Sequence, residues 1–174
     1  MSTLFDQSGE REDGWLRVEG EQPVPDTGNV IVSVDRIAEA LASGRNGKIG
    51  VHLDPLDEVE GIADSLNSIA LVSLDFPSFA NGTSYSKARW LRERHGFNGT
   101  LRATGDIRID QVLFFWRCGF DELLVSHGPT IEALQQDRSP AILELYQPAL
   151  GAEIVAGQRP WQRRWQSVDA QEGS

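Results

Sequence analysis

Residues 101–106, with the sequence Leu-Arg-Ala-Thr-Gly-Asp, contain the pattern that decides the fold. Successive side chains of a strand point to opposite faces of its sheet, so Leu101 and Ala103 would share one face and Arg102 and Thr104 the other. A guanidinium in the middle of a strand costs free energy unless it is paired or hydrated. Arg102 therefore indicates a sheet with one face that is not covered by apolar helices.

The same alternation recurs in the other predicted strands. One face would carry only apolar side chains, namely Ile49, Val51, Leu53, Val72, Leu74, Leu101, Ala103, Leu123 and Val125. The other would carry mainly small or polar ones, namely Gly50, His52, Leu71, Ser73, Arg102, Thr104, Leu124 and Ser126. A doubly wound sheet, which has helices on both faces, is normally apolar on both. The sequence favours a one-sided or half-barrel layout over the doubly wound alternative.

Strands and helices alternate along the middle of the chain. We predict strands at residues 30–32, 49–53, 69–74, 101–104 and 123–126, and helices at 34–41, 57–66, 84–94, 110–118 and 130–136. This alternation is typical of βα units with a parallel sheet, so the predicted class is α/β with about five βα units. Residues 1–29 are predicted to be a loose arm, 30–150 a single domain, and 151–174 a polar tail that contains Trp161 and Trp165.

The charge of the chain is unevenly distributed. Its 174 residues include 26 acidic and 16 basic side chains, for a formal charge of −10. Residues 1–80 carry 15 acidic and 5 basic groups, whereas residues 81–127 carry 5 acidic and 7 basic groups. An acidic chain is a poor partner for nucleic acid, and no apolar run approaches the ~20 residues that span a bilayer. The basic middle third is either a solvated surface or an anion site.

Known cofactor motifs are absent from the sequence. It has no G-x-G-x-x-G, P-loop, G-x-S-x-G or H-E-x-x-H pattern, so nothing indicates NAD or FAD binding. The three histidines lack metal-ligand spacing, and we predict no metal site. Cys118 is the only cysteine, which fits a reducing, cytoplasmic location and cannot hold an iron–sulfur cluster alone. The cofactor, if there is one, is not indicated.

Polar residues that follow the predicted strands form the first candidate site. Ligands of parallel α/β sheets bind beyond the carboxyl ends of the strands. Asp75 and Asp106 lie there as candidate catalytic carboxylates, and Gly105 lies in the adjoining turn. An aspartate in this position can instead cap the next helix. Asp54, Ser126 and His127 belong to the same rim.

Basic residues form the second candidate site, for an anion. Arg102, on the polar face of the sheet, is one member, and Gly105, in the turn after the same predicted strand, is another. Tyr85, Arg89 and Arg92 are spaced i, i+4 and i+7 on the predicted helix 84–94. Arginine forks can grip an oxyanion, although such a stripe can equally be a solvated outer face.

Several short motifs resemble one family of bacterial proteins. They are LDFPSF at 74–79, Gly82, YS-x-AR at 85–89, LRER at 91–94, G-x-LRA-x-GD at 99–106, DQ at 110–111 and RCGFD at 117–121. They are similar to the domain of unknown function DUF934, with the likeness running from about residue 30 to 147. The resemblance implies a predicted oxidoreductase associated with sulfite reduction.

The single cysteine restricts what this resemblance implies. A sulfite reductase needs several cysteine ligands, so we expect an accessory protein of assimilatory sulfate/sulfite reduction that assists or docks on a reductase. The alternatives are a small α/β enzyme or binding protein for an oxyanion-bearing metabolite, and a homo-oligomeric scaffold. Whether the chain is an enzyme stays open.

The chain departs from the family pattern in one loop. Where similar proteins read Asp-Gly-Arg-Gly-Tyr-Ser, residues 81–86 read Asn-Gly-Thr-Ser-Tyr-Ser. The arginine and the second glycine of that pattern are therefore missing from this chain. If the loop arginine binds an anion in similar proteins, the resemblance implies that Arg89, Arg92 or Arg102 binds it here, or that the ligand has changed.

Overall fold

The computed structural model of the chain describes residues 2–77 and 82–136. Eight strands form one sheet in the order β2-β1-β8-β7-β6-β5-β4-β3. They are β1 (Thr3–Asp6), β2 (Gly9–Arg11), β3 (Trp15–Arg17), β4 (Asn29–Ser33), β5 (Ile49–Leu53), β6 (Leu71–Phe76), β7 (Thr100–Gly105) and β8 (Glu122–Val125). Strands β3 to β8 are parallel, and β1 pairs antiparallel with β8 and β2. The predicted α/β class with a largely parallel sheet is confirmed.

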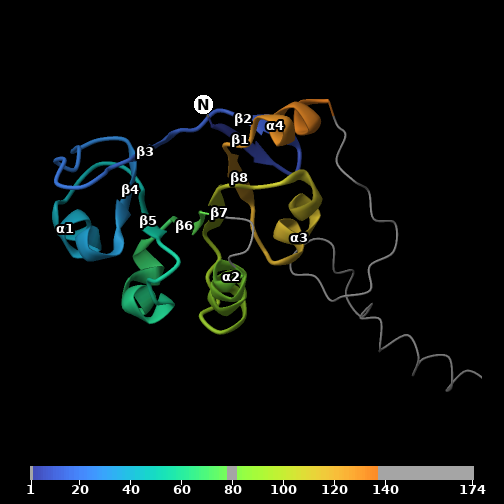
Figure 1. The fold of residues 1–174 in the computed structure, drawn as a ribbon. Coiled ribbons are helices and arrows are strands. Elements are labelled where there is room, and N and C mark those ends of the chain that lie inside the picture. Colours follow the sequence, from blue (N-terminus) through green and yellow to red (C-terminus); the bar gives the residue numbers. More distant parts are fainter. Residues whose placement is uncertain (1, 78–81, 137–174) are drawn as a thin grey trace, which may run out of the picture.

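Helical segments connect the parallel strands (Figure 1). They are η1 (Val34–Arg36), α1 (Ile37–Ala42), η2 (Val59–Ser68), α2 (Thr83–Glu93), η3 (Ile109–Gln111), α3 (Val112–Arg117) and α4 (Gly128–Gln135). The predicted helix at 57–66 is a 3-10 segment, in keeping with the low helix propensity of the Gly, Asp, Ser and Asn residues within it. None of the helices in the described ranges is long and apolar enough to cross a membrane.

The N-terminal residues belong to the sheet, which corrects the prediction of a loose arm. Strands β1, β2 and β3 all lie within residues 1–29, and they raise the strand number from the predicted five to eight. Phe5 of β1 is 2% exposed and packs in the core. Strands of three or four residues are too short to show an apolar period, which explains why the sequence alone did not reveal them. The predicted polar tail at 151–174 lies outside the described residues.

A short connection requires the sheet to curl. β2 and β3 are the two edge strands, yet only residues 12–14 separate them along the chain. Eight strands in a flat sheet would place those edges roughly 34 Å apart at ~4.8 Å per strand. The chain from Arg11 to Trp15 spans at most roughly 15 Å. The sheet therefore closes into a half-barrel, and residues 12–14, called the strap below, cross its open side (Figure 1).

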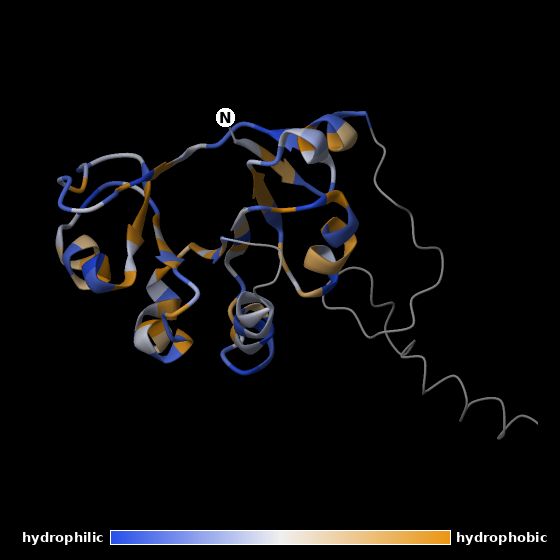
Figure 2. Ribbon diagram, in the orientation of Figure 1, coloured by the Kyte–Doolittle hydropathy of each residue, from blue (hydrophilic) through white to orange (hydrophobic). Residues whose placement is uncertain are grey.

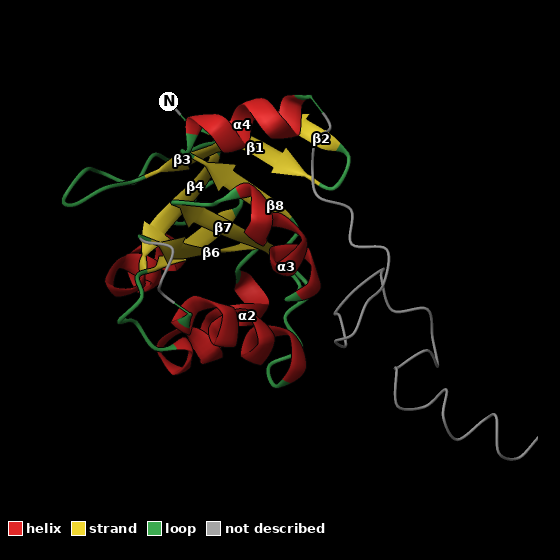
Figure 3. Ribbon diagram, turned by 45° about the vertical axis from the view of Figure 1, so that its right-hand side comes forward, coloured by secondary structure: helices red, strands yellow, loops and turns green. Residues whose placement is uncertain are grey.

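Helices cover the outer face of the curled sheet. Val51, Val72 and Leu101 are aligned on adjacent strands, and all are fully buried. Ala88 of α2 and Phe115 of α3 belong to the same buried core as this row. Figure 2 shows the apolar strands and the mixed character of the helices, and Figure 3 shows α2 and α3 along the curved row of strands. The predicted one-sided layout is confirmed.

Candidate functional site

The inner face of the half-barrel carries a row of polar side chains. His52, Ser73, Arg102 and Glu122 occupy aligned positions on β5, β6, β7 and β8. His52 Nδ1 lies 3.2 Å from Ser73 Oγ. The predicted polar face is therefore real, and its polar groups lie in the concave side of the sheet rather than beneath a helix layer.

Arg102 is held by two carboxylates on this inner face. Its side chain is 1% exposed, and its two terminal nitrogens donate to the carboxylate of Asp13 in the strap at 2.9 and 3.0 Å. Its Nε donates to Glu122 Oε2 at 3.0 Å. A fully buried guanidinium with this pairing anchors the strap to the centre of the sheet. Its role in the structure is architectural, and an incoming anion would have to displace those carboxylates.

The three predicted residues of α2 are in different environments. Arg92 donates to the carbonyl oxygens of Phe97, Gly99 and Gly119 and to Asp121, which places it beside the amino ends of β7 and β8. Arg89 is exposed and pairs with Glu93 at 3.4 Å.

Tyr85 lies in an aromatic cluster. It packs against Phe76, Phe114 and Phe115 at centroid distances of 4.7–4.9 Å, and burial raises the pKa of its hydroxyl. Tyr85, Arg89 and Arg92 are therefore not brought together around one cavity in the described part of the chain.

The two candidate catalytic carboxylates, Asp75 and Asp106, contact different residues. Asp75 Oδ1 lies 3.4 Å from the hydroxyl of Thr104. Asp106 instead contacts Arg108, with Oδ2 accepting from Nη2 at 3.0 Å. Gly105 has a φ of +114°, and a Cβ there would lie 2.3 Å from the carbonyl oxygen of Phe76. The close packing at the end of β7 therefore requires a glycine at position 105.

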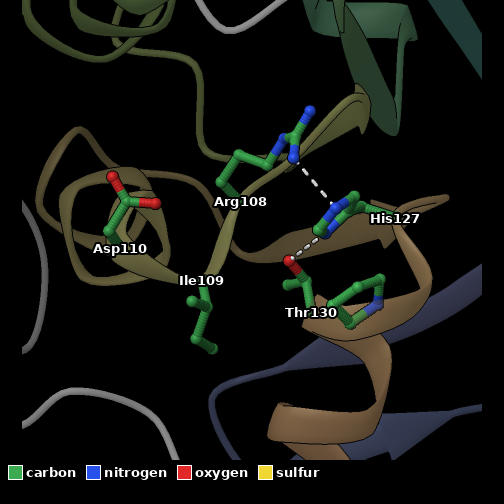
Figure 4. Close-up of a pocket in the computed structure, with 6 residues that line it drawn as sticks. Arg108, Ile109, Asp110, His127 and Thr130 are labelled. Carbon is green, nitrogen blue, oxygen red and sulfur yellow. Dashed lines mark hydrogen bonds between the residues drawn. The ribbon is translucent and has the colours of Figure 1, made fainter.

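A pocket opens at the carboxyl ends of β7 and β8. It has a volume of about 430 Å³. Its lining residues come from the turn after β7, from η3 and from the beginning of α4 with the residue before it, and they are Arg108, Ile109, Asp110, His127, Pro129 and Thr130. Figure 4 shows the Arg108 side chain extending toward the His127 ring, with Ile109 and Asp110 on the opposite wall. This is the edge of the sheet at which the sequence predicts a ligand site.

Hydrogen bonds fix the polar groups of this pocket. Arg108 Nη1 donates to His127 Nε2 at 2.9 Å, so the hydrogen of the neutral ring lies on Nδ1 and is donated to Thr130 Oγ1 at 2.8 Å. Arg108 Nε is also 2.9 Å from Asp106 Oδ1, a close ion pair without hydrogen-bond geometry. Asp106, Arg108, His127 and Thr130 thus form one connected chain, called the Arg108 network below.

With respect to the described residues, the guanidinium of Arg108 has spare hydrogen-bonding capacity. A guanidinium has five N–H groups, of which Asp106 and His127 take up to three. Its side chain is 42% exposed, compared with 1% for Arg102. A planar fork with free donors at the wall of a pocket can bind an oxyanion such as sulfate or phosphate.

Sequence reasoning placed His127 on the rim but missed Arg108 and Thr130. The available signal was the spacing Asp106-x-Arg108 directly after a strand, together with the residues that follow the neighbouring strand at 126–130. That signal is weak, because only the parallel pairing of β7 with β8 brings the two turns together.

Cys118 does not belong to the pocket. It is 4% exposed, and burial raises the pKa of its thiol to about 11, so it is a thiol at neutral pH. Within residues 2–77 and 82–136, no three His, Cys, Asp or Glu side chains are grouped so that they could hold a metal ion.

Fold and site together define a one-sided, curled α/β protein with a small pocket beyond the carboxyl ends of two parallel strands. The chain belongs to the DUF934 family of bacterial proteins of unknown function, whose family model matches residues 50–155. That match includes β5 except its first residue, all of β6 to β8 and the whole Arg108 network. No curated protein matches the chain.

Proposed function

We propose that this protein binds a small oxyanion of the sulfate or sulfite class at the Arg108 network and serves as an accessory protein of sulfate/sulfite assimilation. The observation that carries the proposal is the Arg108 fork, which is half exposed on a pocket wall and oriented by Asp106 and His127. Two donors already in place reduce the ordering cost of binding a tetrahedral or pyramidal anion.

The pocket favours binding over redox chemistry. The one cysteine is buried with a raised pKa, so it offers no thiolate for electron transfer or metal ligation. His127 and Asp106 are used to orient Arg108. An accessory role, in which the protein holds an anion or presents it to a reductase, needs no redox group in this chain. The link to sulfite reduction rests on the family resemblance described above.

Binding can be tested by thermal unfolding in the presence of anions. Sulfate, sulfite and phosphate should each be compared with chloride at equal ionic strength. A ligand at 100 times its Kd stabilises the folded state by about 2.7 kcal/mol, which is readable as a rise in Tm. The Arg108→Gln variant should lose that rise.

Arg89→Gln is the matched control, because it removes an exposed arginine that pairs with Glu93 and does not line the pocket. It should retain the anion-dependent rise in Tm. An equal rise in all three proteins would show general salt stabilisation and contradict the proposal. The Tm of Arg108→Gln in chloride reports separately whether the variant folds normally.

The accessory role has its own test in the host bacterium. Deletion of the gene should slow growth on sulfate as the sole sulfur source and spare growth on cysteine. The wild-type gene should restore growth, and the Arg108→Gln gene should not. Normal growth of the deletion strain on sulfate would refute this role while leaving anion binding to be judged by the thermal data.

A further inference from the structure

A second cavity lies between the segment after β5 and helix α2. Its volume is about 580 Å³. Its lining residues are Pro55, Leu56, Asp57, Glu58, Val59, Glu60, Thr83, Ser86, Lys87 and Trp90, and it is called the α2 groove below. It shares no residue with the pocket of the Arg108 network.

The α2 groove exposes large apolar side chains. Leu56 is 95% exposed and Trp90 is 42% exposed. Within the described residues, only Leu16 and Phe114 are other large hydrophobic residues with comparable exposure. Two such side chains in one concavity mark a surface that gains free energy when another apolar group covers it.

The charge of the groove is acidic. Asp57, Glu58 and Glu60 line it, against the single ammonium group of Lys87. Lys87 is 6% exposed, and its Nζ donates to the carbonyl oxygens of Asp54 and Pro55, both at 2.8 Å. The ammonium group is therefore directed into the wall. The guanidinium of Arg94 already lies over the ring of Trp90, 5.1 Å from its centroid. A segment with positive charge and an aromatic side chain would complement the carboxylates by charge, and Leu56 and the exposed part of Trp90 by apolar contact.

We propose that residues 159–165 of this same chain dock in the α2 groove. These residues lie outside the described part of the structure, and their sequence is Arg-Pro-Trp-Gln-Arg-Arg-Trp. The segment has three arginines, two tryptophans and no acidic residue. It supplies cationic groups for the carboxylates and indole rings for Leu56 and Trp90.

The length of the intervening chain permits docking on the same molecule. The described chain ends at Gln136, and 22 residues, 137–158, precede the segment. That many residues can span roughly 70 Å, whereas a domain of this size has a radius of gyration of roughly 14 Å. In general, a connection long enough to reach a second site gives an effective concentration on the order of millimolar, at which even weak docking is populated.

Disulfide trapping in the full-length protein tests the proposal. Ser86→Cys places a thiol on the groove, and Gln166→Cys places one beside the segment without removing either tryptophan or Leu56. The matched control pairs Gln166→Cys with Glu132→Cys, an exposed position on α4 that is closer to the tail in sequence. We call Ser86→Cys with Gln166→Cys the groove pair and Glu132→Cys with Gln166→Cys the control pair. If the segment docks, the groove pair should form an intrachain disulfide at least about tenfold faster than the control pair.

Charge exchange supplies a second measurement. Glu58→Lys with Glu60→Lys should slow the groove cross-link by several-fold, and adding Arg163→Glu and Arg164→Glu should restore it. Equal rates for the groove and control pairs would overturn the proposal. Cross-links formed only between two molecules would also overturn it, because the occupant would then be a second copy. Neither result bears on anion binding at Arg108.

Discussion

Arg102 and Arg108 lie six residues apart, yet they serve different purposes. Arg102 points into the half-barrel, where Asp13 and Glu122 surround it. Arg108 lies just past the end of β7 and is 42% exposed. An arginine side chain therefore stabilises the fold at position 102 and offers hydrogen-bond donors to a pocket at position 108. The two roles differ because Arg102 is buried and Arg108 is partly exposed.

Substitution of Arg102 should lower stability. Arg102→Ala leaves the Asp13 and Glu122 carboxylates facing each other without a counter-charge and opens a cavity in a fully buried site. We expect a loss of about 3–5 kcal/mol in the free energy of unfolding, measured by urea titration. Arg89→Ala should change it by less than about 1 kcal/mol. Similar values for the two variants would show that Arg102 is not the anchor of the strap.

His52 should make stability depend on pH. Burial lowers the pKa of His52 below its ordinary value of 6.5, and the nearby positive charge of Arg17 acts in the same direction. Its Nε2 lies 3.4 Å from Asp54 Oδ1 without forming a hydrogen bond, so the exposed carboxylate compensates little. The unfolded state then binds more protons than the folded state.

The stability contributed by neutral His52 is complete above pH 6.5 and is lost as the pH falls through the lower folded-state pKa. Urea titrations between pH 7.5 and about 5 should show this slope in the wild type and in His95→Gln, which changes an exposed residue. His52→Gln should flatten it. An unchanged slope in His52→Gln would assign the pH dependence to other groups.

At the scale of the elements, β7 is tightly constrained at its carboxyl end. Gly105 has a positive φ and approaches the backbone of Phe76 closely, so that the following turn can carry Asp106 and Arg108 beside β8. A residue with a Cβ would push β6 and β7 apart where the pocket is assembled.

Gly105→Ala should lower the free energy of unfolding by at least about 2 kcal/mol and weaken the anion-dependent rise in Tm. Gly82→Ala is the control, because Gly82 has a φ of −81° and a Cβ added there would meet no atom within 4 Å. It should be within about 0.5 kcal/mol of the wild type. A neutral Gly105→Ala would mean that the turn after β7 can relax without loss.

At the scale of the whole molecule, the N-terminal strands complete the half-barrel. β1 adds an antiparallel strand to β8, and the strap returns the chain to the opposite edge. Residues 2–17 are thereby tied to both ends of the sheet and, through Asp13, to its centre. Unfolding of this segment should be coupled to unfolding of the domain.

Phe5→Ala should therefore destabilise the domain as a core substitution does, by about 3–5 kcal/mol in chemical denaturation. Leu16 lies in the same segment but is 56% exposed, and Leu16→Ala should cost less than about 1 kcal/mol. If Phe5→Ala caused only local unfolding and left the midpoint of the main unfolding transition unchanged, β1 would unfold independently of the rest of the domain.

The alternation of apolar and polar side chains was sufficient to predict the central parallel strands from the sequence. The aligned row of Val51, Val72 and Leu101 on one face, with His52 and Arg102 on the other, follows from strict alternation, and the structure has this register. The three short N-terminal strands could not be predicted, because they have no period and exist only by pairing with distant residues.

The sequence by itself determined the α/β class, the one-sided sheet and the edge at which a ligand would bind, because side-chain alternation and strand ends are local properties. Only the tertiary structure decided which arginine is buried between carboxylates and which one lies partly exposed on a pocket wall. Asp13 reaches Arg102 from 89 residues away, and Arg108 meets His127 through the pairing of β7 with β8. Such pairings depend on how the chain closes on itself, and no local spacing encodes that closure.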